Sequence, residues 1–259
     1  MDAPPPLLSV KDLEVGFELP EGRLMAIKKA SFEIFSGKTV ALVGESGSGK
    51  SVISQTIMGL LPPQAEIYGG SISFAPNLES NSVIDVAKLD PNSKSMREIR
   101  GGQISIIFQE PMTSLNPVLS IGRQLREPLE LHLGMTKQQS LSRSSELLEL
   151  VGIPDPATRL KTFPHQTSGG QRQRIMIAMA LSCEPKLLIA DEATTALDVT
   201  IQAQILEIIK ELTDRLGTSV IIITHNLGVV ARYADSVNVM YAGKLRESGS
   251  LDQVYKEPK

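Results

Sequence analysis

Residues 44–51 read Gly-Glu-Ser-Gly-Ser-Gly-Lys-Ser and match the pattern G-x-x-x-x-G-K-S/T, which is typical of phosphate-binding loops. An apolar run at residues 39–43 precedes the loop, and residues 52–61 begin a helical pattern after it. This order of strand, glycine-rich turn and helix directs backbone N–H groups and the positive end of a helix dipole at an anion. A chance match in a linker would not be enclosed by an apolar strand and an apolar helix, so the sequence predicts a phosphate-binding site.

The loop residues have expected roles in that site. Glycines at positions 44, 47 and 49 let the backbone bend so that successive N–H groups point inward. Lys50 supplies a full positive charge for the β- and γ-phosphates of a nucleotide, and the Ser51 hydroxyl is suited to bind Mg²⁺. The predicted nucleotide-contacting residues of this segment are Gly44, Glu45, Ser46, Gly47, Ser48, Gly49, Lys50, Ser51 and Val52.

The composition fits an enzyme-like globular domain. The 259 residues are enough to bury a sizeable core, and the formal net charge is −3. No basic block stands out, Trp is absent and aromatic residues form 4% of the chain, so nucleic acid is not an expected partner. The single cysteine, Cys183, excludes an internal disulfide and fits a reducing compartment. Because it lies in an apolar helical run, we expect a core residue rather than a nucleophile.

Neither a membrane span nor an export signal is visible in the sequence. No segment approaches the roughly 18 apolar residues that are needed to cross a bilayer. The N-terminal segment has neither the basic region nor the apolar stretch of a signal peptide. We therefore expect a cytosolic chain, which can still dock onto a membrane protein.

Strand and helix patterns alternate along most of the chain. The predicted strands lie at residues 8–17, 27–34, 39–43, 102–108, 186–190 and 220–224, with a closing hairpin at 237–240 and 244–247. Gly69, Gly70 and the polar stretch at 79–95 are predicted to form turns or loops. Buried apolar strands that alternate with helices indicate a mostly parallel sheet in an α/β fold.

One long helical stretch interrupts this alternation. The pattern is helical from residue 112 to about residue 159 and again at 170–182. Breaks are expected at Pro117, Pro128, Gly134 and Gly152. We interpret residues 112–180 as an inserted helical subdomain. After it, an amphipathic helix is predicted with one apolar face formed by Ile201, Ile205, Ile208 and Leu212.

Two adjacent carboxylates end a predicted strand. Residues 187–190 are apolar and lead directly into Asp191 and Glu192. The carboxyl end of a strand in an α/β sheet is the edge at which phosphate loops also lie. We expect Asp191 to hold Mg²⁺, directly or through water, and Glu192 to act as general base toward the attacking water. Such a pair alone could equally form a cap or salt bridges, but a phosphate-binding loop in the same chain favours the catalytic interpretation.

The segment Thr167-Ser168-Gly169-Gly170-Gln171 carries a family resemblance. It comes shortly before the two carboxylates and resembles the signature, close to Leu-Ser-Gly-Gly-Gln, of the ATP-binding cassette (ABC) transporter ATPases. Two glycines and a hydroxyl group at a helix N-terminus suit a phosphate. In that family the loop serves the nucleotide of the opposite subunit. The resemblance therefore implies that Ser168, Gly169, Gly170 and Gln171 contact ATP that is bound to a partner cassette.

The other family positions follow in order along the chain. The resemblance assigns Gln109 as a catalytic and metal-contacting residue that senses Mg²⁺ and the attacking water. It places Asp198 in a loop at the dimer interface and gives His225 contact with the γ-phosphate. Phe17 occupies the expected region of the aromatic residue that stacks on adenine, and a core Phe in a β-strand is nearly as well supported.

The resemblance covers about residues 7–259 and implies a P-loop NTPase of the ABC ATPase type. This fold has a RecA-like core, an N-terminal antiparallel β-subdomain and an inserted helical subdomain. We expect a single ABC ATPase domain over residues 1–259, with core and β-subdomain at about 7–110 and 181–259 and the helical subdomain at about 111–180. The implied ligands are ATP and Mg²⁺.

Several segments narrow the resemblance to the oligopeptide, dipeptide and nickel importers. They include Gln-Glu-Pro-Met-Thr-Ser-Leu-Asn-Pro at residues 109–117, Phe-Pro-His at 163–165 and Met-Tyr-Ala-Gly at 240–243. The branch implies a second ABC ATPase subunit, two integral membrane permeases that dock near residues 111–130, and an external solute-binding protein. The chain would lie at the cytoplasmic face of the inner membrane. Peptide is the preferred solute, with nickel or another small solute as the alternative.

Three positions depart from the family pattern: Thr167 where Leu is usual, Ala193 where Pro is common and Asn226 where Asp is usual. They remove no catalytic group, but they keep open a catalytically weak cassette in an asymmetric pair. The presence of Glu192 and His225 argues against that alternative. A nucleotide switch without transport, as in ABC proteins of repair or translation, is disfavoured because no coiled-coil or RNA-binding insertion is visible.

Overall fold

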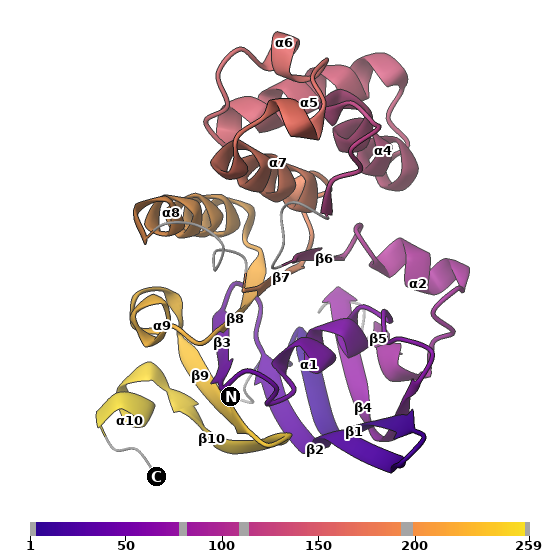
Figure 1. The fold of residues 1–259 in the computed structure, drawn as a ribbon, viewed down its shortest axis with the longest axis vertical. Helices are drawn as coiled ribbons and strands as arrows, with labels where there is room; N and C mark the ends of the chain where they lie inside the picture. Colours follow the sequence, from indigo (N-terminus) through magenta and orange to yellow (C-terminus); the bar gives the residue numbers. More distant parts are fainter. Residues whose placement is uncertain (1–3, 78–81, 109–113, 193–198, 257–259) are drawn as a thin grey trace. The chain divides into compact units, whose positions relative to one another are not determined.

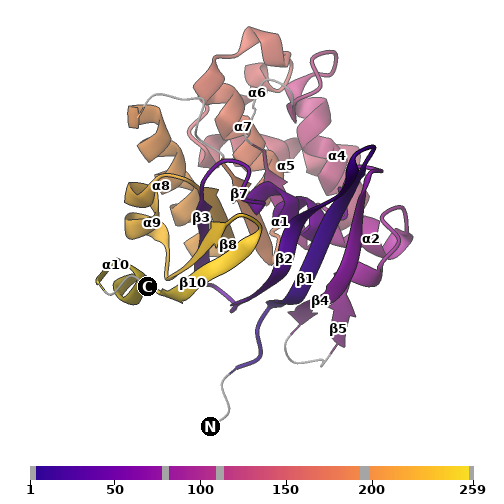
Figure 2. The same cartoon turned by 60° about the horizontal axis from the view of Figure 1, so that its bottom comes forward.

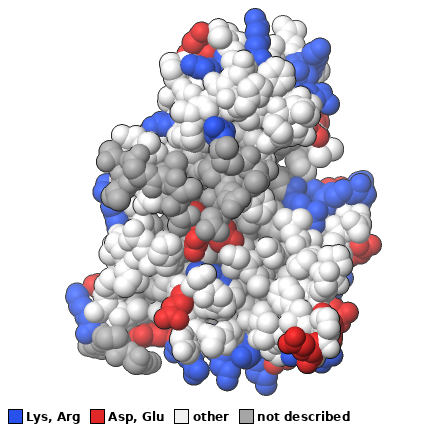
Figure 3. Space-filling model, viewed as in Figure 1, with Lys and Arg blue, Asp and Glu red and all other residues white. Residues whose placement is uncertain are grey.

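The computed structural model describes residues 4–77, 82–108, 114–192 and 199–256 (Figure 1). The chain folds into two compact units. The first contains the residues up to 97 together with residues 217–259, and the second contains residues 98–216. On the face in Figure 3, the described side chains of Lys and Arg are interspersed with those of Asp and Glu, which matches the small net charge.

The first unit contains an antiparallel sheet with the strand order β2-β1-β4-β5 (Figure 2). Its strands are β1 (Leu8–Leu19), β2 (Gly22–Ile34), β4 (Ala65–Asn77) and β5 (Ser82–Asp85). Fully buried side chains along these strands include Leu8, Leu13, Ile27, Ile34, Ile72 and Phe74. The predicted strands at 8–17 and 27–34 are confirmed, and both are longer than predicted because they continue into the hairpin that joins β1 to β2.

Strand β4 corrects the expectation that Gly69 and Gly70 form a turn. Gly70 has a φ angle of +85°, and a Cβ atom there would lie 2.5 Å from the backbone oxygens of Lys11 and Asp12. The pairing of β1 with β4 shifts in register between Lys11 and Glu14. The two glycines therefore mark a β-bulge, where the backbones approach too closely for a side chain.

The first unit also contributes strands to a second sheet: β3 (Thr39–Gly44), β8 (Ser219–Thr224), β9 (Ser236–Tyr241) and β10 (Lys244–Ser250). β3 lies between β8 and β9 and pairs with both in parallel, and β10 pairs antiparallel with β9. Nearly all side chains of β3 and β8 are buried, as expected for parallel strands covered on both faces. The predicted strands at 39–43 and 220–224 and the closing hairpin are thus confirmed.

Short helices complete the first unit. They are α1 (Lys50–Ile57), η1 (Val86–Lys88), α2 (Lys94–Ile99), α9 (Leu227–Tyr233) and α10 (Leu251–Lys256). The last residues of one of them, α2, belong to the second unit. Val230 packs against Ala41, Val43 and Val237 in a small core that α10 also covers. The polar stretch at 79–95, expected as loop, holds β5, η1 and the start of α2 in its described part. Val86 is buried within it and anchors the segment.

The second unit combines a parallel pair of strands with a set of helices. The strands are β6 (Ile104–Ile107) and β7 (Leu187–Asp191), and the helices are α4 (Ile121–Leu133), α5 (Lys137–Leu150), α6 (Pro156–Arg159), η2 (Pro164–Gln166), α7 (Gly169–Leu181) and α8 (Val199–Leu216). One apolar core joins both strands to α4, α5, α7 and α8. Ile205 and Leu212 are buried in that core, so the apolar face predicted for α8 is confirmed.

Pro128 lies inside α4, which corrects the expected break at that residue. A proline in a helix interior removes one backbone hydrogen bond and usually kinks or ends the helix. Here the side chains of Ile121, Leu125 and Leu129 are all fully buried along α4, so packing on both sides of the proline stabilises the helix. The break at Gly134 is confirmed, because this glycine caps α4 with a φ angle of 63°. In the part of the chain that the structure describes, no helix combines the length and apolar character of a membrane span.

His132, near the end of α4, packs against the turn that precedes β6. A Cβ atom on Gly101 would lie 3.1 Å from the His132 Nε2 atom, so the imidazole ring lies over this turn. Burial lowers the pKa of His132 below its usual value of 6.5, because the charged imidazolium is desolvated. Between the lowered pKa and 6.5 the unfolded chain binds more protons than the folded chain. The contribution of His132 to the free energy of unfolding therefore decreases as the pH falls below 6.5.

We expect the substitution His132→Gln to flatten the pH dependence of stability on the acid side. Urea unfolding at pH 5, 6 and 7 measures this slope for the wild type and the variant. His165→Gln, at an exposed histidine of the same unit, is the matched control for the loss of one histidine side chain. A slope that His132→Gln does not alter would contradict the assignment.

Candidate nucleotide-binding site

The phosphate-binding loop joins β3 to α1 in the first unit. β3 ends at Gly44, and α1 begins at Lys50 with Gly49 as its N-cap. The φ angles of Gly44, Gly47 and Gly49 are 154°, 78° and 106°, and residues other than glycine rarely adopt such angles. The loop thus has the bent backbone that the spacing of its glycines predicts.

Two of these glycines also lie where no side chain fits. A Cβ atom on Gly44 would lie 2.2 Å from the carbonyl oxygen of Met240, and one on Gly49 would lie 2.8 Å from that of Ala26. At Gly47 a Cβ atom would meet nothing within 4 Å. The loop is therefore packed tightly against β2 and β9 but is open beside Gly47.

The turn between β9 and β10 holds the loop in place. The Gly243 N–H donates a 3.0 Å hydrogen bond to the carbonyl oxygen of Ser48, and the Lys28 N–H donates a 2.7 Å bond to that of Gly243. A Cβ atom on Gly243 would lie 2.5 Å from the carbonyl oxygen of Ala26. The sequence pattern indicates residues 242–243 only as the centre of a hairpin. Gly243 is the feature of the sequence that could indicate this contact with the loop. A glycine in a hairpin turn is common for other reasons, so the sequence alone does not single it out.

Lys50 and Ser48 supply polar groups at the loop. Lys50 is 5% exposed, and its Nζ atom donates hydrogen bonds of 2.8 Å to the carbonyl oxygens of Gly44 and Glu45. The Ser48 hydroxyl is buried and finds no hydrogen-bond partner among the described residues. A buried hydroxyl without a partner is unfavourable unless a ligand or water satisfies it. A held ammonium group, an unsatisfied hydroxyl and an open glycine together fit an anionic polyphosphate.

Helix α1 carries the last two predicted residues of the loop segment. Ser51 is exposed and Val52 is half-buried in its first turn, so the Ser51 side chain is accessible to a ligand. The helix ends at Ile57, within the residues 52–61 that were expected to begin a helix. Gly59 has a φ angle of 59°, and the Leu60 N–H donates to the carbonyl oxygen of Gln55, as in a glycine-terminated helix.

Phe17 lies near the end of β1, in the same unit as the loop. It pairs with Leu24 of β2 and with Ala65 of β4. Its side chain is half-buried and does not belong to the fully buried core. Part of the aromatic ring is therefore accessible for stacking, while the backbone fixes its position.

His225 follows β8 directly and is exposed. The next residue, Asn226, caps α9, because its Oδ1 atom accepts a 2.9 Å hydrogen bond from the Gly228 N–H. Asn and Asp are both favoured at this helix position. Asn226, which stands where the family usually has Asp, therefore still caps the helix that begins beside His225.

In the second unit, Asp191 and Glu192 lie at the carboxyl end of β7. Asp191 is the last residue of the strand and is 8% exposed, and Glu192 follows it and is half-buried. Glu192 has a φ angle of 46°, which is uncommon for a residue other than glycine. Strain of this kind costs on the order of 1–3 kcal/mol and is concentrated at functional sites. The turn that follows β7 is therefore tightly constrained at Glu192.

The signature residues begin helix α7. Ser168 is the N-cap, and its Oγ atom accepts a 3.3 Å hydrogen bond from the Gln171 N–H. In return, the Ser168 N–H donates a 3.2 Å bond to Gln171 Oε1, which completes a capping box. A Cβ atom on Gly170 would come no closer than 3.6 Å to Ile201, so this chain itself leaves room for a side chain there.

Thr167, where the family usually has Leu, is buried and makes a local hydrogen bond. Its Oγ1 atom donates a 2.7 Å bond to the carbonyl oxygen of Pro164 in η2. We expect Thr167→Val, which keeps the shape and removes the hydroxyl, to lower the free energy of unfolding by about 1 kcal/mol. Urea denaturation measures this, with Thr158→Val at an exposed position as control. Equal stability of Thr167→Val and wild type would contradict it.

Three positions of the sequence interpretation lie outside the described residues: Gln109, Asp198 and Ala193. The first unit contains Phe17, the loop at 44–52 and His225. The second contains Asp191, Glu192 and the signature at 168–171.

The fold and the loop define a P-loop nucleotide-binding ATPase of the cassette type. The chain belongs to the ABC transporter family, because a sequence model of that family matches residues 27–195.

Two curated relatives and one solved structure are similar over nearly the whole chain. The dipeptide transport ATP-binding protein DppD of Bacillus subtilis (strain 168) is 54% identical over 97% of this chain and 73% of its own length. The oligopeptide transport ATP-binding protein OppD of the same organism is 51% identical over 98% of this chain and 68% of its own length. A dimeric ATP-binding cassette bound to ADP and Pi is 26% identical, with a TM-score of 0.80 over 94% of this chain and 98% of that one.

Proposed function

We propose that this chain is the ATP-hydrolysing subunit that powers an importer of peptides. The observation that carries the proposal is the phosphate-binding loop with the Lys50 ammonium held against its carbonyl oxygens, in a chain similar to peptide transport ATP-binding proteins. The names of both relatives favour peptide over the alternative of nickel or another small solute.

In this proposal the loop at residues 44–52 binds the β- and γ-phosphates of ATP. Its backbone N–H groups donate to phosphate oxygens, the Lys50 ammonium neutralises their charge and the Ser48 hydroxyl gains a partner. Phe17 stacks on the adenine through the accessible part of its ring. Mg²⁺, when bound, neutralises charge on the β- and γ-phosphates. The residues that would hold it are Ser51, Asp191 and Gln109.

Hydrolysis then requires one base and several groups that stabilise charge. Glu192 accepts a proton from water as the water oxygen bonds to the γ-phosphorus, and the bond to the leaving ADP oxygen breaks. His225 and Gln109 orient the γ-phosphate and the water, while Lys50 stabilises the charge that develops on the phosphate oxygens. The products are ADP and inorganic phosphate.

A second ABC ATPase subunit, identical or related, completes the proposed assembly. The signature residues at 168–171 and Asp198 would act on ATP bound to that partner. The room beside Gly170 supports this, because the chain's own packing does not explain the glycine. The dimeric form of the similar cassette structure also supports it.

The proposed assembly also contains two permeases in the membrane. An external solute-binding protein delivers the solute to them. The docking segment is the region near residues 111–130. In its described part, Val118 is 77% exposed, and Leu131 just beyond it is 72% exposed. The buried Gln124 amide donates to the carbonyl oxygens of Asn116 and Leu119, at 3.0 and 2.9 Å, and so fixes the loop that presents Val118. The chain would therefore lie peripherally at the cytoplasmic face of the inner membrane.

The proposal is tested by ATP hydrolysis of the purified chain, alone and assembled with candidate partner cassette and permeases in liposomes. The solute-binding protein is added outside with a labelled peptide or with Ni²⁺. We expect Mg²⁺-dependent turnover that increases on assembly, requires Glu192 and drives peptide uptake. ATP binding without Glu192-dependent turnover in the full assembly would overturn the catalytic role and favour a catalytically weak cassette. Uptake of Ni²⁺ in place of peptide would overturn the assignment of the solute.

A further inference from the structure

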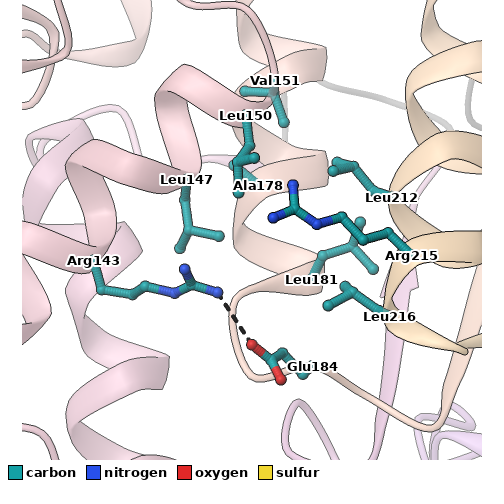
Figure 4. Close-up of a pocket in the computed structure, with 10 residues that line it drawn as sticks. All are labelled: Arg143, Leu147, Leu150, Val151, Ala178, Leu181, Glu184, Leu212, Arg215 and Leu216. Atoms are coloured by element: carbon teal, nitrogen blue, oxygen red, sulfur yellow. Dashed lines mark hydrogen bonds and ion pairs between the residues drawn. The ribbon is translucent and has the colours of Figure 1, made fainter.

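A pocket of about 220 Å³ lies between α5, α7 and α8 of the second unit, and none of its lining residues has a role in the proposed ATP chemistry (Figure 4). Its walls are mainly leucine side chains from the three helices: Leu147, Leu150, Leu181, Leu212 and Leu216. At the end of α5 the Val151 carbonyl oxygen accepts a 2.8 Å hydrogen bond from Arg174 of α7, which ties the two walls together.

Three charged side chains also line the pocket: Arg143, Glu184 and Arg215. Arg143 is already neutralised, because its guanidinium group lies 3.0 Å from Glu146 and 3.1 Å from Glu184. Figure 4 shows the Arg143 and Arg215 side chains extending toward the pocket from opposite sides, with Glu184 joined to Arg143.

Arg215 has a different electrostatic environment. It is exposed, and within the described chain no carboxylate forms an ion pair with it. Its neighbour Asp214 is engaged by Lys210, one helical turn away, at 2.7 Å. A guanidinium group without a carboxylate, at the edge of an apolar pocket, is a suitable partner for the carboxylate of a ligand, which it can bind through two parallel hydrogen bonds.

The size of the pocket limits the ligand. An apolar cavity of roughly 150 Å³ lined by aliphatic and aromatic side chains binds benzene. The pocket here is somewhat larger and has an opening, since Leu150 at its edge is 40% exposed. It therefore suits a body of about six to ten non-hydrogen atoms with a polar group left at the opening.

We propose that this pocket binds a small organic monocarboxylate with a branched or cyclic apolar body. The body lies among the leucine side chains of α5, α7 and α8, and the carboxylate accepts hydrogen bonds from Arg215. The site lies wholly within the second unit and does not depend on the proposed transport function. Because α7 begins at the signature residues, a bound ligand would add packing contacts that stabilise the helix carrying them.

The test is isothermal titration calorimetry of the full chain with 4-methylpentanoate as the probe. The neutral isostere 4-methylpentanamide has the same apolar body without the charge. We expect binding of one probe molecule per chain, and at least roughly tenfold weaker binding of the amide, because a charge-assisted pair is lost. Arg215→Ala should weaken binding of the acid by a similar factor. Arg123→Ala, at an exposed arginine of α4 outside the pocket, should leave it unchanged.

A second variant places a like charge at the opening. Leu150→Glu should abolish binding of the acid while thermal unfolding shows that the protein remains folded. The proposal is overturned if folded wild type shows no saturable binding, if acid and amide bind equally, or if Arg215→Ala retains full affinity. Tighter binding of L-leucine than of 4-methylpentanoate would overturn the proposal that the ligand is a monoanion. It would indicate a zwitterionic ligand whose ammonium group pairs with Glu184.

Discussion

Replacing Glu192 with glutamine is expected to lower ATP turnover by a factor of about 10² to 10⁴, the usual contribution of a general base. The substitution keeps the size of the side chain and its hydrogen-bonding capacity, but the amide cannot accept the proton of the attacking water. Affinity for ATP should stay nearly unchanged, because the phosphates are assigned to the loop at 44–52. The two effects are measured as kcat in the assembled pair and as the dissociation constant of ATP by calorimetry.

The matched control for this prediction is Glu211→Gln on α8. Glu211 is an exposed glutamate of the same unit, so its neutralisation changes the net charge equally and should leave kcat unchanged. Glutamine has the same branching as glutamate, so we expect the φ angle of 46° at position 192 to be retained. A Glu192→Gln enzyme that keeps more than about a tenth of the wild-type kcat would show that another group is the base.

Those parts of the fold that depend on local patterns could be predicted from the sequence. β3 and β8 are built around runs of consecutive apolar residues at 40–43 and 220–223, and such runs have few interpretations in an α/β chain. The glycine spacing of the loop predicts positive φ angles, and Gly44, Gly47 and Gly49 have them. The pattern at 201–212 predicts the buried face of α8.

The errors occurred where a distant segment changes the meaning of a local signal. Gly69 and Gly70 are typical of a turn, but here they let β4 pass the bulge of β1 near Asp12. Pro128 is typical of a helix end, but the buried side chains around it keep α4 intact. Gly70 meets Lys11 and Asp12, which are distant in the chain, and the buried side chains around Pro128 pack in a core that other helices share, so a local pattern cannot indicate either outcome.

The same reasoning applies to the candidate sites. A short motif predicts the roles of Lys50 and Ser51. The hydrogen bond from the Gly243 N–H to the Ser48 carbonyl oxygen, in contrast, joins residues far apart in the chain. The pocket beside Arg215 is built from three helices, and no spacing in the sequence brings Leu147 and Leu212 together. Sequence therefore indicates the chemistry of a motif, and the structure adds the contacts that hold it.

Replacing Lys50 with methionine is expected to weaken ATP binding by at least about 100-fold, which corresponds to about 2.7 kcal/mol. Methionine has a similar unbranched apolar stem but lacks the ammonium group. Lys50 is the only cationic residue of the segment 44–52, so no neighbour in the loop replaces the lost charge. Turnover should fall to the background level, because the charge that develops on the γ-phosphate also loses its partner.

Two further measurements separate binding from folding. The Lys50 ammonium donates to the carbonyl oxygens of Gly44 and Glu45, so its loss also removes support from the free loop. Thermal unfolding without nucleotide reports that part, and calorimetry with ATP reports the loss of phosphate binding. Lys38→Met is the control, since Lys38 is exposed and pairs with Asp235 at 3.0 Å outside the loop. Full ATP affinity in a folded Lys50→Met protein would mean that backbone N–H groups alone hold the phosphates, because the charge of Lys50 would then be dispensable.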